Sequence, residues 1–316
     1  MLKTVIVLFL IFQVESVYAL ATAKATVLVV DENGAPIVGV DAGLGFSAPK
    51  NNGWGSKSSG NRGLTDQDGK YTSSGATERI LRYGARHPGY YTSRYKFIDF
   101  TGTSGILGFR KWQPWNPTLK VILKKIKNPI AMYAYHTDVI DIPKQGDFIG
   151  YDLVKHDWVT PYGKGITADF LFKLDHNFVS KIDYETIFSI KFSNLADGIQ
   201  GFSLLESHGS ILRSAHHAPE TGYQNKLIQS RLQQPNKRLV TSYNYNTSYY
   251  FRIRCNGDKL DSCLYGKIYR NIEFSENNLS FTYYLNPSNV DTNVEFDPNS
   301  NLFKKLKSTM HEVNAP

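Results

Sequence analysis

Residues 25–40 read ATVLVVDENGAPIVGV, and this stretch indicates the fold of the chain. Ala25–Val30 is rich in β-branched residues, Asp31–Gly34 is a turn sequence, and a second apolar run follows at Pro36–Val40. Such runs on either side of a turn are typical of paired strands. Similar short runs recur to the end of the chain, at 119–123, 186–192, 249–255, 264–269 and 279–285.

Composition agrees with an all-β protein of two domains. The chain has 316 residues, 41% hydrophobic and 20% charged, with 20 Tyr and 18 Phe. These values exclude a disordered chain, a collagen and a coiled coil. We expect a seven-stranded, Ig-like or prealbumin-like sandwich over residues 20–125. A larger antiparallel sandwich or jelly-roll-like domain should follow over residues 126–316, with one short helix where Leu302–Val313 has helical spacing.

The first 19 residues predict export. Lys3 precedes the apolar run Thr4–Phe12, which is too short to span a bilayer. The segment Val17–Ala19 then ends in a small residue, as signal-peptide cleavage sites do. We interpret residues 1–19 as a signal peptide cut after Ala19 or Ala21, which predicts a secreted or periplasmic product. The alternative is a retained N-terminal anchor, and no later stretch could cross a membrane.

Two cysteines, Cys255 and Cys263, flank the turn Asn256–Asp258 between two strand-like runs. In an exported chain such a pair predicts a disulfide across a hairpin. Neither cysteine belongs to a C-x-x-C motif, so a redox-active thiol is the weaker alternative.

Three motifs occur in the first part in the same order as in a known family. They are V-x-V-x-D-x-x-G-x-P-I-x-G at Val27–Gly39, T-D-x-D-G-x-Y at Thr65–Tyr71 and A-R-H-P-G-Y-Y at Ala85–Tyr91. Residues 24–126 therefore resemble the carboxypeptidase regulatory-like (transthyretin-like) β-sandwich. The resemblance implies structural turns and a non-catalytic module. A Gly- and Ser-rich stretch at Ser47–Gly63, read as a long loop carrying Trp54, and an insertion at Thr92–Trp115 depart from that pattern.

The second part carries phrases such as N-P-I-x-M-Y-A at Asn128–Ala134, D-W-V-x-P-Y-G-K-G at Asp157–Gly165 and F-T-Y-Y-L-N-P at Phe281–Pro287. With these phrases the whole chain resembles secreted bacterial proteins of unknown function. That resemblance implies no activity.

The formal net charge of +8 lies entirely in the first part. Residues 20–125 contain 15 Lys and Arg against 7 Asp and Glu, whereas residues 126–316 contain 20 of each kind. If Ile80–Arg86 is a regular strand, Arg82 and Arg86 share one of its faces. The excess predicts a surface for an anionic partner, or else a solvated face that keeps the chain soluble. It is concentrated at Arg79, Arg82, Arg86, Arg94, Lys96, Arg110 and Lys111.

Two tryptophans, Trp112 and Trp115, follow Arg110 and Lys111 in a Pro-containing segment. Exposed tryptophans can stack on sugar rings, and adjacent cations suit acidic sugars. The candidate ligand-binding residues are therefore Arg82, Arg86, Arg110, Lys111, Trp112 and Trp115. The alternative is that both tryptophans fill the junction of the two domains.

Motifs of enzymes are mostly missing from the sequence. It has no G-x-S-x-G or H-E-x-x-H, so we expect no catalytic residue, metal or cofactor of those kinds. An exported protein with no nucleic-acid motif is not expected to bind nucleic acid. The leading hypothesis is a non-enzymatic protein that contacts an acidic polysaccharide or envelope component. The alternatives are a carbohydrate-active lyase or hydrolase using carboxylates of the second domain, from among Asp152, Asp157, Asp169 and Glu206, and a purely structural surface component.

Overall fold

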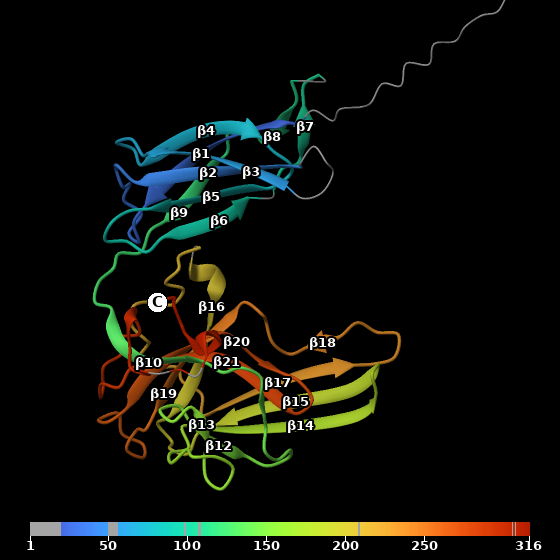
Figure 1. The fold of residues 1–316 in the computed structure, drawn as a ribbon, viewed down its shortest axis with the longest axis vertical. Coiled ribbons are helices and arrows are strands. Elements are labelled where there is room, and N and C mark those ends of the chain that lie inside the picture. The colour runs from blue at the N-terminus through green and yellow to red at the C-terminus, as the bar shows by residue number, and fades with distance from the viewer. Residues whose placement is uncertain are drawn as a thin grey trace, which may run out of the picture. The chain divides into compact units, whose positions relative to one another are not determined.

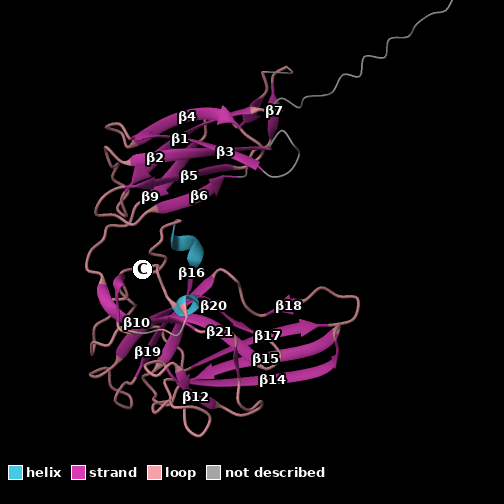
Figure 2. Ribbon diagram, viewed as in Figure 1, coloured by secondary structure: helices cyan, strands magenta, loops and turns pink. Residues whose placement is uncertain are grey.

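The computed structural model describes residues 20–49, 56–97, 99–106, 109–207, 209–304, 306 and 308–316. Within these ranges the protein is all-β, as predicted, and its only helical elements are two short 3-10 turns (Figure 2). The chain divides into two compact units. Unit 1 comprises the described residues up to Val29 with Pro36–Gly84 and Tyr95–Lys120, and unit 2 comprises Val30–Ala35, Ala85–Arg94 and Val121–Pro316.

The first sheet of the N-terminal sandwich is built on β1 (Figure 1). The side chains of β1 alternate, and Ala23, Ala25, Val27 and Val29 are fully buried. That period of two gives the strand one core face, as its β-branched sequence predicts. The strand order is β4-β1-β8-β7, and β9 also pairs with β1. The strands are β1 (Thr22–Val30), β4 (Lys70–Ala76), β7 (Gly102–Ser104), β8 (Lys111–Gln113) and β9 (Thr118–Ile122).

The second sheet has the order β3-β2-β5-β6 and faces the first. Ala42, Leu44 and Phe46 point into the core from β2. Phe46 meets the first sheet, because a Cβ added to Gly75 on β4 would lie 2.7 Å from its ring. The two sheets therefore form a sandwich. The strands are β2 (Asp41–Pro49), β3 (Ser56–Leu64), β5 (Leu81–Arg86) and β6 (Ser93–Phe97).

Two local expectations for this part were wrong. The stretch Ser47–Gly63, expected to be a long loop, mostly forms the paired strands β2 and β3, whose register runs from Asp41 opposite Leu64 to Pro49 opposite Ser56. The run Pro36–Val40, expected to be a strand, contains a single bridge and a turn. Trp54 lies outside the described residues.

Both predicted Asp turns are present, and in each the carboxylate holds the backbone. One oxygen of Asp66 accepts hydrogen bonds from the N–H groups of Asp68 and Lys70, at 3.0 and 2.8 Å. Asp31 accepts in the same way from the residues two and four positions on. These are Asx turns, so the carboxylates that the motifs contain have a structural role.

In unit 2, two larger sheets enclose an aromatic core. Phe170, Phe172 and Phe188 enter this core from the six-stranded sheet, and Phe251 and Phe281 enter it from the seven-stranded sheet. The first sheet has the order β13-β12-β14-β15-β17-β18. Its strands are β12 (Ile149–Asp152), β13 (Asp157–Trp158), β14 (Phe170–Ser180), β15 (Asp183–Lys191), β17 (Lys226–Gln233) and β18 (Val240–Thr241).

The seven-stranded sheet is covered on both faces. A second buried cluster, containing Met132, Tyr265, Tyr284 and Phe296, lies on the face away from the aromatic core. The order is β16-β19-β20-β21-β10-β22, and β11 also pairs with β21. The strands are β10 (Ile130–His136), β11 (Ile140–Asp141), β16 (Gly198–Ser203), β19 (Thr247–Ile253), β20 (Leu264–Phe274), β21 (Asn278–Leu285) and β22 (Phe296–Asn301).

A lysine of β20, Lys267, lies on the second of these faces and is 2% exposed. Its Nζ donates to Ser214 Oγ at 3.1 Å and lies 4.7 Å from the ring centroid of Tyr284. Burial, with a smaller effect of Lys124, lowers the pKa of Lys267 to about 7, and Glu295 opposes this shift. An ammonium group in this position carries a desolvation cost.

Near the C-terminus, Leu302–Val313 forms one 3-10 turn, Thr309–His311, within its described part. Three of the apolar residues that suggested a helix still pack inward, because Phe303 and Leu306 contact the aromatic core and Val313 joins the second cluster, whereas Met310 is 64% exposed. The predicted disulfide between Cys255 and Cys263 is also present, just after β19.

Candidate functional site

The six candidate binding residues separate into three groups. Arg110 and Trp112 line one cavity. Lys111 and Trp115 form a pair beside it, with Lys111 Nζ 4.9 Å from the Trp115 ring centroid. Arg82 and Arg86 are on β5, which belongs to the other sheet.

The cavity, which we call the Trp112 cavity, has a volume of about 290 Å³ and lies within unit 1. Its lining combines one large aromatic ring, two arginines, one acid and several small or polar side chains. These residues are Leu20, Ala21, Thr77, Glu78, Arg79, Thr103, Arg110 and Trp112.

Alternation along β8 explains why Arg110 and Trp112 meet in this cavity. Residues two apart along an extended chain project to the same side, whereas Lys111 between them projects to the opposite side. The chain is fixed at this point, because Thr22 on β1 pairs with Lys111 and its N–H donates to the carbonyl of Arg110 at 2.8 Å.

Trp112 is held by its own contacts. Its Nε1 donates to the carbonyl oxygen of Thr77 at 2.9 Å, and its ring centroid is 5.2 Å from that of the buried Phe100. The ring is therefore a fixed wall of the cavity.

Arg110 is also oriented by a neighbour on the hairpin. Its Nε and Nη2 both donate to Thr103 Oγ1, at 3.1 and 2.6 Å. Arg79 is exposed and lines the same cavity, where Glu78 contributes the opposite charge. The charged residues of the lining thus sum to one positive charge, which favours an anionic occupant.

On β5 the predicted alternation holds. Arg82 and Arg86 are exposed, while Leu81 and Ala85 are buried. Arg82 Nη1 donates to Ser47 Oγ on the neighbouring β2, at 3.0 Å. These two arginines form a basic strand face that is separate from the Trp112 cavity.

The sequence did not reveal the other half of the cavity. Thr77 and Glu78 follow β4 and lie 35 and 34 residues before Trp112, whereas Thr103 on β7 lies nine residues before it. Arg79 was noted only as part of the charge excess. The pairing of β7 with β8 sets Thr103 opposite Trp112. Thr77 reaches the cavity through β1, because its N–H donates to the carbonyl of Ala21 and the next residue, Thr22, pairs with Lys111.

The carboxylates considered for catalysis lie in unit 2, where β12, β13 and β14 meet. Their oxygens accept hydrogen bonds from backbone N–H groups. Asp152 accepts hydrogen bonds from four N–H groups, two at each oxygen, between 2.9 and 3.0 Å. Burial opposes ionisation of this group, but the four donors hold its pKa below the usual value. The donors are Val154, Lys155, Ile166 and Thr167.

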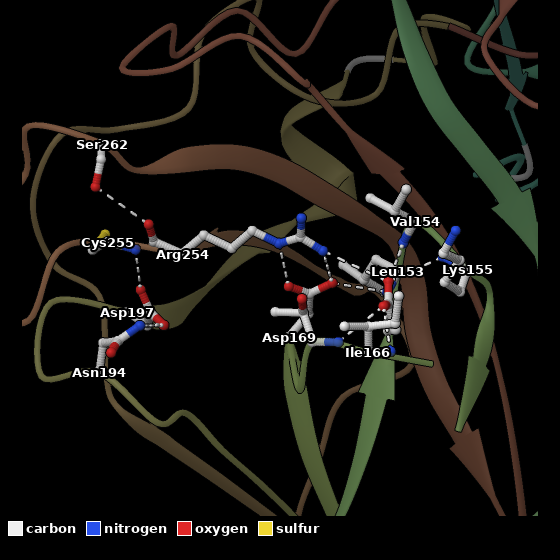
Figure 3. A network of polar contacts seen from close by, with 12 residues as sticks. Leu153, Val154, Lys155, Ile166, Asp169, Asn194, Asp197, Arg254, Cys255 and Ser262 are labelled. Atoms are coloured by element: carbon white, nitrogen blue, oxygen red, sulfur yellow. Dashed lines mark hydrogen bonds and ion pairs between the residues drawn. The ribbon is translucent and has the colours of Figure 1, made fainter. Parts of the chain in front are cut away.

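Asp169 is joined to Arg254 by two hydrogen bonds, of 2.7 and 2.9 Å (Figure 3). Its Oδ2 also accepts from the N–H of Leu153 at 2.8 Å. Burial raises the pKa of Asp169, and Arg254 and the Leu153 N–H oppose that rise. The same guanidinium lies 3.6 Å from Asp152, so one arginine compensates two buried acids.

Asp157 completes this group. One of its oxygens accepts from the N–H of Trp158 and the other from the N–H of Lys164. The side chain of Glu206 lies outside the described part of the structure. The three described carboxylates already bind loop backbone, so they supply a rigid corner of the sheet rather than an acid and base facing a substrate.

Among the described residues, no three His, Cys, Asp or Glu side chains come together as metal ligands. In the same part of the chain, no helix is long and apolar enough to cross a membrane.

No protein-family profile and no curated protein matches this sequence. Among solved structures, a shaft pilin of Lactobacillus rhamnosus GG is similar at 11% identity over 87% of this chain and 96% of the pilin, with a TM-score of 0.24. A streptococcal ancillary pilin shares 12% identity over 90% of this chain and 63% of its own, with a TM-score of 0.22. A Bacteroides uniformis protein with a proposed carbohydrate-binding role shares 10% identity over 84% and 98%, with a TM-score of 0.18. Scores this low support no assignment.

Proposed function

We propose that this is an exported, non-enzymatic binding protein whose N-terminal sandwich holds an acidic sugar in the Trp112 cavity. The observation that carries the proposal is the combination in one cavity of a fixed indole ring with the guanidinium groups of Arg79 and Arg110. An indole offers an apolar face to a sugar ring, and arginine forms paired hydrogen bonds with a carboxylate or sulfate.

The size of the cavity limits the ligand. About 290 Å³ is near the lower end of the range of about 300–1,000 Å³ for small-molecule sites. One sugar unit of a chain therefore enters it, and the remaining units lie outside. Lys111 and Trp115 form a separate cationic and aromatic pair on the opposite side of β8, and neither residue lines the cavity.

Export is supported by the disulfide between Cys255 and Cys263, because such bonds persist in oxidising compartments. The predicted signal peptide lies outside the described residues and stays a prediction. The resemblance to the carboxypeptidase regulatory-like family also stays a prediction.

The test is binding of the full chain to an oligogalacturonate and to a neutral dextran oligomer, measured by titration calorimetry. Arg110→Gln removes one charged hydrogen-bond donor, which is worth about 1.5–3 kcal/mol, and should weaken the acidic ligand about 10- to 100-fold. Arg238→Gln makes the same change of charge at an exposed position of unit 2 and should have no effect. Equal affinity of the wild type and Arg110→Gln for the acidic ligand would refute the site.

A further inference from the structure

The Trp112 cavity is built around the first residues of the N-terminal sandwich. Leu20 and Ala21 line it, and β1 begins directly after them. Ala21 is 6% exposed, and its carbonyl accepts a hydrogen bond from the Thr77 N–H at 3.1 Å. The N–H of the next residue donates to the Arg110 carbonyl at 2.8 Å. Hydrogen bonds on both sides therefore fix the path of the chain where it passes the cavity.

The predicted signal peptide ends at the same place. Its sequence allows a cut after Ala19 or after Ala21, because a small residue precedes each bond. A cut after Ala21 would delete Leu20 and Ala21 from the cavity wall and leave the Thr77 N–H without its acceptor. A cut after Ala19 preserves these contacts. The structure therefore favours Leu20 as the first residue of the exported protein.

Cleavage at this bond changes the charge of the cavity. A signal peptidase uses water to break the C–N bond between residues 19 and 20. The water oxygen bonds to the carbonyl carbon of Ala19, and both water protons end on the nitrogen of Leu20. An uncharged peptide nitrogen thus becomes an α-ammonium group, which keeps its proton below about pH 8.

Charged side chains from two segments line the same cavity as Leu20. Glu78 and Arg79 follow β4, and Arg110 precedes β8. The wall on β7 contributes the uncharged Thr103. Two arginines and one glutamate give the lining one net positive charge, and the ammonium group would add a second. The new charge would strengthen the attraction for an anion, and Glu78 would offset the repulsion between the three cations.

We infer that the chain is cut between residues 19 and 20, and that the ammonium group of Leu20 becomes the third cation of the Trp112 cavity. This inference rests on the proposed function, because it makes cleavage during export the last step in building the acidic-sugar site. The ammonium group and the two guanidinium groups would together bind one carboxylate or sulfate of the sugar. The uncut chain, whose nitrogen at this position is an uncharged amide, would bind the same sugar more weakly.

The first test is the N-terminus of the exported protein. The full 316-residue chain is produced in a bacterium with a general secretory pathway, and the exported product is analysed by mass spectrometry. We expect Leu20 to be its first residue. A product that begins at Thr22, or a chain that keeps residues 1–19, would overturn the inference.

The second test is the contribution of the ammonium group to binding. The mature protein is compared with a form in which pyridoxal phosphate has converted the α-amino group to a ketone, a reaction that leaves lysine side chains unchanged. At pH 6.5 the loss of this charge should weaken oligogalacturonate binding about tenfold in titration calorimetry. The unmodified protein should lose about the same factor between pH 6.5 and pH 9, as the ammonium group releases its proton. The modified form should show no such loss.

A third measurement needs no ligand. Methyl groups enriched in carbon-13, added to the α-amino group by reductive methylation, report its titration by NMR. Glu78→Gln should lower the pKa of this amino group, because it removes the acid that lines the same cavity. Glu220→Gln makes the same change at an exposed position of unit 2 and should leave that pKa unaltered. Both positions are exposed, so thermal melting should give the wild-type midpoint for each variant.

The outcomes separate the inference from the proposed function. An amino group that titrates identically in the wild type and Glu78→Gln lies outside the cavity, and this result would overturn the inference. Oligogalacturonate binding that depends on Arg110 but is equal in the unmodified and modified forms would leave the proposed function standing and sink the role of the ammonium group. A Leu20 amino group that responds to Glu78→Gln, in a protein that binds no acidic sugar, would support the cleavage site and refute the proposed function.

Discussion

Replacement of the buried Lys267 by Met should make the protein more stable at neutral pH. Lys267 is 2% exposed, and burial lowers its pKa from 10.5 to about 7. Its hydrogen bond to Ser214 and its contact with the Tyr284 ring offset only part of the cost of enclosing an ammonium group. Met has similar length and no charge, so it fills the site without that cost.

The pH dependence gives the magnitude. Because the folded pKa lies below that of the unfolded chain, the penalty is fully present below about pH 7 and disappears as the pH rises toward 10.5. At about 1.36 kcal/mol for each pKa unit, the full penalty is about 5 kcal/mol. Between pH 7 and pH 9 the folded chain has released this proton while the unfolded chain keeps it, so about 2 kcal/mol is recovered.

Urea unfolding at the two pH values checks this, in a background in which Trp54, Trp112 and Trp115 are replaced by Phe. The remaining Trp158 is in the core of unit 2, so its fluorescence reports the unfolding of this unit. The stability advantage of Lys267→Met over the wild type should shrink by about 2 kcal/mol from pH 7 to pH 9. The exposed Lys226→Met serves as the control and should follow the wild type at both values. A pH-independent difference between Lys267→Met and the wild type would refute the assignment of a lowered pKa to Lys267.

Two further changes test the packing of each unit. Arg254→Met leaves the carboxylate of Asp169 buried without its partner, and should cost about 3–5 kcal/mol of unfolding free energy in urea at pH 7; a loss below about 1 kcal/mol would contradict the role given to this pair. Gly75→Ala sets a methyl group 2.7 Å from the Phe46 ring and should cost about 1–3 kcal/mol. Gly102→Ala, where nothing lies within 4 Å of the new atom, should leave the thermal midpoint almost unchanged, and equal losses in the two glycine variants would show that the clash is absorbed.

The parts of the fold that the sequence predicted are those with one buried face. On β5, Leu81 and Ala85 alternate with Arg82 and Arg86 in the sequence. In the structure the first two are buried and the two arginines are exposed. β3 escaped prediction because it is an edge strand with polar residues and glycines on its exposed positions, such as Ser59 and Asn61. Its pairing comes from β2, and such a strand carries no apolar period of its own.

The candidate site was predicted in part for a related reason. Arg110 and Trp112 are close in the sequence, and their spacing of two is sufficient to bring them to one side of a strand. Thr77, Glu78 and Arg79 reach the same cavity only through the order of strands in the sheet. In the same way, the gathering of the buried acids around Arg254 depends on register between distant strands, which local patterns do not specify.

The double burial of the seven-stranded sheet has a consequence for hydrogen exchange. β20 is hydrogen-bonded to β19 on one side and β21 on the other, and Leu264–Ile268 is buried on both faces. Its amides are therefore hydrogen-bonded to neighbouring strands and buried from water, so their exchange with deuterium requires the unfolding of the whole unit. Terminal strands such as β13 and β18 are short and lie at sheet edges, so they exchange by local fraying. One peptide from β20 thus reports the global stability of the unit.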